Sequence, residues 1–197
     1  MAVRQPELFS NQPGLPAGFR YEEDFLSPAA EAALLSDLER LAFANARYKE
    51  WTAKRRIVSY GGRYDFSTSE LLPASPVPPF LVDLRAAAAG FAGATAAELT
   101  HALVAEYPAA TQLGWHRDVP EFELVVGISL KGAARMRLRR YPHVAGSRER
   151  SLAVELAPRS IYCLQGEARW GWQHAISPTP GLRYSITFRS LRRADAR

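Results

Sequence analysis

The segment Arg183-Tyr184-Ser185-Ile186-Thr187-Phe188-Arg189 predicts a β-strand with two chemically different faces. Side chains alternate between the two faces of a strand. The apolar face therefore carries Tyr184, Ile186 and Phe188, and the polar face carries Arg183, Ser185, Thr187 and Arg189. The two arginine Cα atoms lie about 20 Å apart at ~3.3 Å per residue. Guanidinium groups bind carboxylates through paired hydrogen bonds, so arginines reaching toward each other predict a site for a short dicarboxylate of the size of 2-oxoglutarate. A strand with a solvated basic face is the alternative.

The stretch Gly114-Trp115-His116-Arg117-Asp118 predicts two metal ligands. His116 and Asp118 are two positions apart, so on an extended strand they point to the same side. A third ligand could come from His174. Two histidines and one carboxylate form the facial triad of non-haem iron(II) oxygenases, which leaves coordination positions open for a co-substrate and oxygen.

Two other histidines compete with this assignment. His143 is the rival third ligand, and we rank it below His174 because it falls in a polar loop beside Pro142. His101 shares the predicted strand face of Tyr107, but it has no carboxylate partner at ligand spacing. We interpret it as a histidine whose polar ring atoms find partners within the sheet and which binds no metal.

Taken in order, these segments resemble the AlkB-like family of iron(II)- and 2-oxoglutarate-dependent dioxygenases. The family typically shows N-x-Y, H-x-D, H and R-x-N-x-T-x-R. Here Ala105 and Ser185 stand where asparagines are usual, so two hydrogen bonds to the co-substrate are shortened or missing. The similarity covers about residues 20 to 190. It also includes Arg55 to Gly61, Tyr64 to Phe66 and Leu164 to Trp170.

The resemblance implies a fold, a set of cofactors and roles for particular residues. It implies iron(II) held by His116, Asp118 and His174, with 2-oxoglutarate and O2 as co-substrates. Arg183 and Arg189 would neutralise the two carboxylates of 2-oxoglutarate, and Tyr107 and Ser185 would assist in binding it. Oxidative decarboxylation would yield succinate and CO2, and a hydroxylated N-methyl group would leave as formaldehyde.

The resemblance also points to an N-alkylated nucleobase in DNA or RNA as substrate, which must be unstacked to reach the metal. Residues 55–80 mix arginines with aromatic rings and are expected to form a substrate lid. Candidate substrate contacts are Tyr60, Arg63, Tyr64 and Arg117. In the alternative interpretation, Tyr60 and Phe66 pack in the core and the arginines are solvated.

Three functions from different classes fit the sequence. The first is a nucleic-acid dealkylase. The second is an oxygenase of the same chemistry that acts on a tRNA nucleoside, a protein side chain or a small molecule. The third is a jelly-roll binding module without turnover. Succinate formation separates the third function from the others, and formaldehyde release from methylated oligonucleotides separates the first two.

The order of elements predicts a mainly β fold with flanking helices (α+β). Ser27-Pro28 begins a helix that runs to about Phe43, and Pro79 opens a second. About eight strands follow without strand–helix–strand alternation. This order favours a jelly roll, the double-stranded β-helix, with two helices packed on its outer face. We expect an irregular arm over 1–18, a single domain over 19–190 and a basic tail over 191–197.

Composition limits the class of protein. The chain has 197 residues, 47% of them hydrophobic, with a net charge of +5, which permits but does not require a polyanionic partner. The single cysteine, Cys163, excludes an internal disulfide and fits a reducing compartment. No apolar run approaches the ~20 residues of a membrane span, and no signal region is visible. We expect a cytoplasmic monomer that does not associate with membranes.

Overall fold

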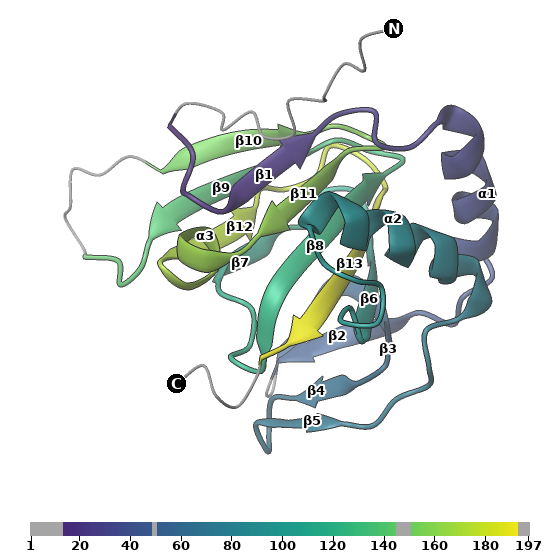
Figure 1. Ribbon diagram of the computed structural model, residues 1–197, viewed down its shortest axis with the longest axis horizontal. Helices are drawn as coiled ribbons and strands as arrows, with labels where there is room; N and C mark the ends of the chain where they lie inside the picture. Colours follow the sequence, from purple (N-terminus) through teal and green to yellow (C-terminus); the bar gives the residue numbers. More distant parts are fainter. Residues whose placement is uncertain (1–13, 49–50, 145–150, 193–197) are drawn as a thin grey trace, which may run out of the picture.

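Two antiparallel sheets packed face to face form the body of the protein (Figure 1). The computed structural model describes residues 14–48, 51–144 and 151–192. The larger sheet has the strand order β1-β11-β8-β13-β6-β3-β2, and the smaller has the order β10-β9-β12-β7. The larger sheet comprises β1 (Phe19–Glu22), β2 (Ala44–Tyr48), β3 (Trp51–Tyr60), β6 (His101–Tyr107), β8 (Phe122–Leu130), β11 (Ile161–Leu164) and β13 (Arg183–Leu191). The smaller sheet comprises β7 (Leu113–His116), β9 (Ala134–Arg140), β10 (Leu152–Leu156) and β12 (Trp172–Ile176).

Helices cover the outer face of the larger sheet (Figure 1). Helix α1 (Pro28–Leu38) begins as predicted, with the Ser27 hydroxyl accepting a hydrogen bond from the Ala30 amide. It ends at Leu38 and not near Phe43, because the chain turns there and enters β2. Leu41 and Phe43 still pack on the core from this connection, which explains their misleading helical spacing.

The second helical segment follows its prediction closely. A 3₁₀ turn, η1 (Pro79–Leu81), leads into α2 (Val82–Ala92). Gly93 ends α2 in the left-handed conformation, with φ of 70°, which glycine adopts without steric cost. Within the described part of the chain, no helix is long and apolar enough to cross a membrane.

Strand β13 divides the interior into two parts. Its Tyr184, Ile186 and Phe188 side chains join the apolar cluster beneath α1 and α2. Its opposite face points toward the smaller sheet, where a second apolar cluster and a polar cavity lie between the sheets. The predicted alternation and the jelly-roll fold with helices on one outer face are therefore confirmed.

Three local features differ from the sequence-based expectation. A short third helix, α3 (Gly166–Trp170), precedes β12, whereas the sequence predicts only two helices. Strand β7 ends at His116, which places Asp118 beyond the strand. The expected lid, residues 55–80, contains a two-stranded hairpin, β4 (Arg63–Asp65) and β5 (Glu70–Leu72), which its mixture of arginines and rings did not predict (Figure 1).

Candidate metal and co-substrate site

Three side chains converge where the smaller sheet faces β13. His174 on β12 pairs directly with His116 at the end of β7, and their ring centroids are 4.2 Å apart. Asp118 turns back toward them, with its Oδ2 atom 3.6 Å from His174 Nε2. One ligand atom from each residue can be chosen so that all three lie within 4.8 Å of one another. The structure therefore brings together the three predicted ligands, although Asp118 lies outside the strand.

The protonation states of these three groups suit a divalent cation. His116 Nδ1 lies 2.9 Å from the Gly114 carbonyl oxygen. This contact favours a proton on Nδ1 and leaves Nε2 free to bind a metal. Burial, reinforced by His116, lowers the pKa of His174 to about 3. Burial opposes ionisation of Asp118, but Arg189 and both histidines lower the pKa of that carboxyl well below its usual range. Two neutral imidazoles and one carboxylate fit iron(II).

Arg189 fixes the Asp118 carboxylate. Its Nε donates to Asp118 Oδ1 at 2.6 Å, and its Nη1 lies 3.3 Å from His101 Nδ1. Because a guanidinium can only donate, His101 Nδ1 must accept and its ring must be neutral. Burial and the Arg189 charge lower the pKa of His101 to about 3. His101 is therefore more than a satisfied sheet histidine, because it orients the arginine that holds a metal ligand.

His101 is expected to make stability depend on pH. Its pKa is about 3 in the folded protein and about 6.5 when unfolded. Between these values only the unfolded chain binds the proton, so the free energy of unfolding should fall as pH drops below 6.5. The limiting slope is about 1.4 kcal/mol per pH unit.

The test is urea unfolding of the metal-free parent and of metal-free His101→Asn between pH 7 and 5. The free energy of unfolding should depend less steeply on pH in His101→Asn, a variant that keeps an acceptor for Arg189. An identical pH dependence in both proteins would contradict the assignment.

Arg183 lies at the other end of the β13 polar face. It is 1% exposed, and its Nε donates to Ser129 Oγ at 2.9 Å. Its Nη1 is buried and has no hydrogen-bond partner among the described residues. An unsatisfied buried donor costs about 1–3 kcal/mol, and a carboxylate would satisfy it. Arg183 and Arg189 thus bracket the cavity, with Ser185 between them on its wall.

Tyr107 and Arg55 complete this end of the cavity. The Arg183 guanidinium carbon lies 5.0 Å from the Tyr107 ring centroid, and Arg55 Nη1 donates to the Tyr107 hydroxyl at 3.3 Å. Burial alone would raise the pKa of Tyr107, but the two arginines together lower it. The mixture of arginines and rings in residues 55–80 predicts Arg55 on the lid surface. The alternation of β3 could have placed it facing inward, on the same side as Ile57.

Arg169 is a second residue that the sequence analysis missed. It lies on α3, is 2% exposed, and belongs to a segment noted only for its family similarity. Its Nη2 atom lies 3.0 Å from the Asp118 carbonyl oxygen, 2.8 Å from that of Val119 and 2.8 Å from that of Phe122. The Arg169 side chain therefore fixes the position of the backbone that follows the metal ligand Asp118.

Comparison with known proteins identifies the family. The family described as the 2OG-Fe(II) oxygenase superfamily matches residues 18–189. The chain belongs to this superfamily. The oxygenase is 31% identical over 175 residues to the "Alkylated DNA repair protein ALKBH8 homolog" of Arabidopsis thaliana, an alignment that covers 78% of this chain. It covers 49% of that relative, so the chain spans about half of the relative's length.

Two solved structures share the fold of the oxygenase at low sequence identity. OsALKBH1 superposes with a TM-score of 0.69 at 17% identity, covering 89% of this chain and 98% of the other. A prolyl-4-hydroxylase from Pseudomonas putida superposes with a TM-score of 0.61 at 14% identity, covering 89% and 93%. These two structures show the shared fold. The family match itself identifies a dioxygenase that uses iron(II), 2-oxoglutarate and O2, and the His-Asp-His cluster supplies ligands for the iron.

The four predicted substrate contacts do not line the cavity of the oxygenase. Tyr60 packs against the apolar cluster under the helices, and this burial raises its pKa. Arg63 and Tyr64 lie on the β4–β5 hairpin, where the Tyr64 ring packs edge-on against Phe66 at 4.9 Å. Arg117 turns to the outside and stacks on Tyr141. Arg117 Nη1 also donates to the Trp170 carbonyl oxygen at 2.9 Å, so its side chain is held away from the cavity even though it lies between two metal ligands.

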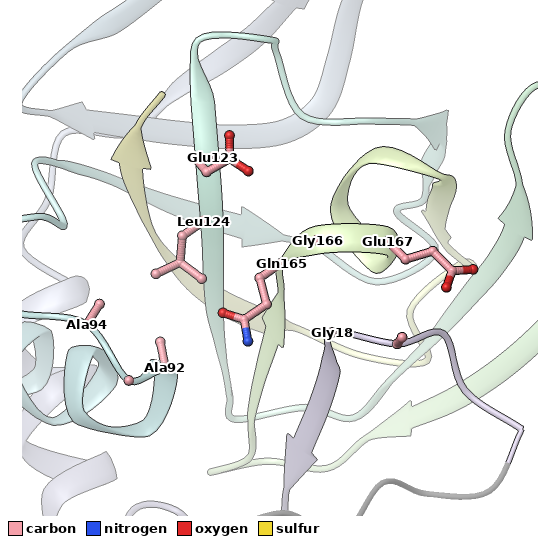
Figure 2. Close-up of a pocket in the computed structure, with 10 residues that line it drawn as sticks. Gly18, Ala92, Ala94, Glu123, Leu124, Gln165, Gly166 and Glu167 are labelled. Carbon is pink, nitrogen blue, oxygen red and sulfur yellow. The ribbon is translucent and has the colours of Figure 1, made fainter. Parts of the chain in front are cut away.

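Figure 2 shows a second, larger cavity, whose lining differs from that of the cavity between the sheets. This open groove of about 530 Å³ is bordered by Ala92, Leu124, Gln165 and Glu167, among others. Its carboxylates already accept hydrogen bonds, because Glu123 binds Trp170 Nε1 at 2.8 Å and Glu167 binds Trp172 Nε1 at 3.2 Å. The groove holds none of the three metal ligands, so the chemistry is assigned to the smaller cavity between the sheets.

Proposed function

We propose that this oxygenase removes N-alkyl groups, in the first instance N-methyl groups, from nucleobases in DNA or RNA and releases succinate, CO2 and formaldehyde. The observation that carries the proposal is the similarity of most of the chain to a relative named as an alkylated DNA repair protein. The net charge of +5 fits a polyanionic substrate.

Each end of the cavity has a distinct role in this reaction. His116, Asp118 and His174 would hold the iron, which supplies activation of oxygen for attack on a C–H bond. Arg183 would bind the carboxylate of 2-oxoglutarate that lies farther from the metal, through its unpaired buried Nη1. Arg189, next to Asp118, would face the nearer carboxylate.

The cavity walls would limit the access of water. Leu113, Val125, Met136 and Ile176 contribute apolar surface around the polar groups. Such a lining excludes bulk water and strengthens the electrostatic contacts of the arginines. A methylated base would have to leave its stack to reach this space. We keep Arg63 and Tyr64, on the β4–β5 hairpin, as proposed contacts to the nucleotides around it.

Formaldehyde release tests the proposed function. Purified enzyme with iron(II), ascorbate and 2-oxoglutarate should convert oligonucleotides carrying N-methylated bases into demethylated product, detected by a loss of 14 Da per methyl group. The yield of formaldehyde should match that of product. Unmethylated oligonucleotides and His116→Ala enzyme serve as controls. Turnover of methylated peptides in the absence of any activity on nucleic acid would contradict the proposal.

A hydroxylase acting on a tRNA nucleoside, a protein side chain or a small molecule is the second candidate. It is favoured by one observation, namely that none of the four expected base-contacting residues reaches the cavity. The same mass measurement distinguishes it, because stable hydroxylation adds 16 Da and produces succinate without formaldehyde. Membership of an enzyme family leaves no support for a binding module without turnover.

A further inference from the structure

The outer face of the smaller sheet carries a group of cations and rings that the catalytic site does not use. We name it the basic–aromatic patch and define it as Trp115, Arg117, Arg137, Arg139 and Tyr141. We propose that this patch binds the sugar–phosphate backbone of a nucleic acid beside the nucleotide being modified. This inference rests on the proposed function and extends it to a second contact surface.

Strand alternation gives the patch its geometry. Arg137 and Arg139 are two positions apart on β9. Met136, which precedes Arg137, and Leu138, which lies between the two arginines, are fully buried. The two arginines therefore project outward together, about 6.6 Å apart at ~3.3 Å per residue. That separation is comparable to the step between successive phosphates of a nucleic-acid strand. Across the sheet they pair with Ala175 and Gln173 of β12.

Aromatic rings hold the guanidinium groups in place. The guanidinium carbons of Arg137 and Arg139 lie 5.0 and 4.4 Å from the centroid of the Trp115 ring. That of Arg117 lies 3.6 Å from the centroid of Tyr141. Stacked arginines lose less freedom on binding than free side chains, and their planar forks match phosphate oxygens. The patch is thus ordered before any ligand arrives.

The charges of the patch have no counterpart in the described residues. Arg137 donates to Ser151 Oγ at 3.1 Å, Arg139 to Gln173 Oε1 at 2.8 Å and Arg117 to the Trp170 carbonyl oxygen at 2.9 Å. All three acceptors are neutral, and none of these arginines forms an ion pair within residues 14–48, 51–144 and 151–192. By contrast, Arg135 on the same face lies 3.5 Å from Glu155 Oε1. Three fixed cations that no described carboxylate neutralises favour a polyanion.

The position of the patch separates binding from chemistry. Trp115 precedes the ligand His116, and Gln173 precedes the ligand His174, so patch and triad lie on opposite faces of the same sheet. A nucleotide in the cavity cannot touch the patch, which must therefore contact neighbouring nucleotides of a longer chain. A membrane surface fits less well, because the rings lie against guanidinium groups and do not project as free apolar anchors.

The test compares two double variants with the same change in charge. Arg137→Ala/Arg139→Ala removes two patch cations, and Arg40→Ala/Lys131→Ala removes two exposed cations outside the patch. Fluorescence anisotropy of a labelled single-stranded oligonucleotide would be measured across a salt series, with iron and 2-oxoglutarate bound and oxygen excluded. The patch variant should bind about tenfold or more weakly. Its slope of log Kd against log salt should fall by about 1.4, which is about 0.7 for each lost phosphate contact. The control should match the parent within twofold.

The outcomes separate this proposal from the proposed function. Equal binding by parent and patch variant, or parent binding to phosphatidylserine vesicles in preference to the oligonucleotide, overturns the patch proposal. Formaldehyde release from methylated oligonucleotides by the parent would leave the proposed function standing in that case. Conversely, binding that depends on Arg137 and Arg139, in an enzyme that demethylates no nucleic acid, supports the patch and overturns the dealkylase.

Discussion

Replacing His116 with alanine should abolish the formation of succinate from 2-oxoglutarate, with a loss of at least about 1000-fold. The change removes one of three ligands that the structure brings within 4.8 Å of each other. The remaining pair, Asp118 and His174, would lose both the metal's affinity and its facial geometry. Succinate would be quantified under saturating iron and 2-oxoglutarate, so that weak binding alone cannot hide residual turnover.

His143→Ala provides the matched control for this prediction. His143 was the rival third ligand, and it lies exposed in the connection after β9. It is absent from the ligand cluster found among the described residues. We expect this variant to keep the parental rate. The His116→Ala protein should unfold at a similar temperature to the metal-free parent, because its backbone pairing with β12 is unchanged. Parental turnover in folded His116→Ala would refute the ligand assignment.

Arg183→Ala should raise the KM for 2-oxoglutarate by about 100-fold while changing kcat far less. Truncating one partner of a buried charge pair costs about 2–5 kcal/mol, and each 1.4 kcal/mol is a factor of ten. Arg183 faces the co-substrate cavity but touches none of the three metal ligands. Steady-state succinate formation over a wide range of 2-oxoglutarate concentrations measures both constants.

Two further substitutions sharpen this measurement. Arg183→Lys keeps the charge but loses the two-pronged hydrogen bond, so its KM should lie between those of the parent and Arg183→Ala. Arg189→Ala should also raise the 2-oxoglutarate requirement. It should lower kcat as well, because Asp118 loses the donor that lies 2.6 Å from it. An unchanged KM in Arg183→Ala would contradict the bracketing of the dicarboxylate by the two arginines.

The parts of the site that alternation governs could be predicted from the sequence. On β13, period-two alternation separated the arginines from Tyr184, Ile186 and Phe188, and the structure places these groups on opposite faces. His116 and Asp118 also meet as predicted, although Asp118 lies beyond the strand and alternation therefore does not explain its position. The helix prediction was wrong beyond Leu38. Apolar spacing shows only that Leu41 and Phe43 reach the core, and they do so from a connection that is not helical.

The residues that support the site could not be found in this way. His101 and Arg169 act through partners that are 88 and 47 to 51 positions away in the chain. Their roles depend on strand order and register, which a local pattern does not encode. A charged side chain is also usually solvated, so no local pattern predicts that Arg169 is buried or that Arg55 turns inward. Arg117 was expected to contact substrate because it lies between the ligands His116 and Asp118, and its stacking on Tyr141 could not be seen in the sequence.

Strand β7 lies at the edge of the smaller sheet. Among the residues that the structure describes, β7 pairs with β12 alone, and His116 is its last residue. An edge strand, which has a single paired neighbour, loses its backbone hydrogen bonds more readily than a central strand does. An ion bound by both His116 and His174 would cross-link β7 to β12. The affinity for iron and the stability of the pairing between these two strands would therefore depend on each other. Substitutions that loosen β7 would then weaken iron retention even with every coordinating atom intact.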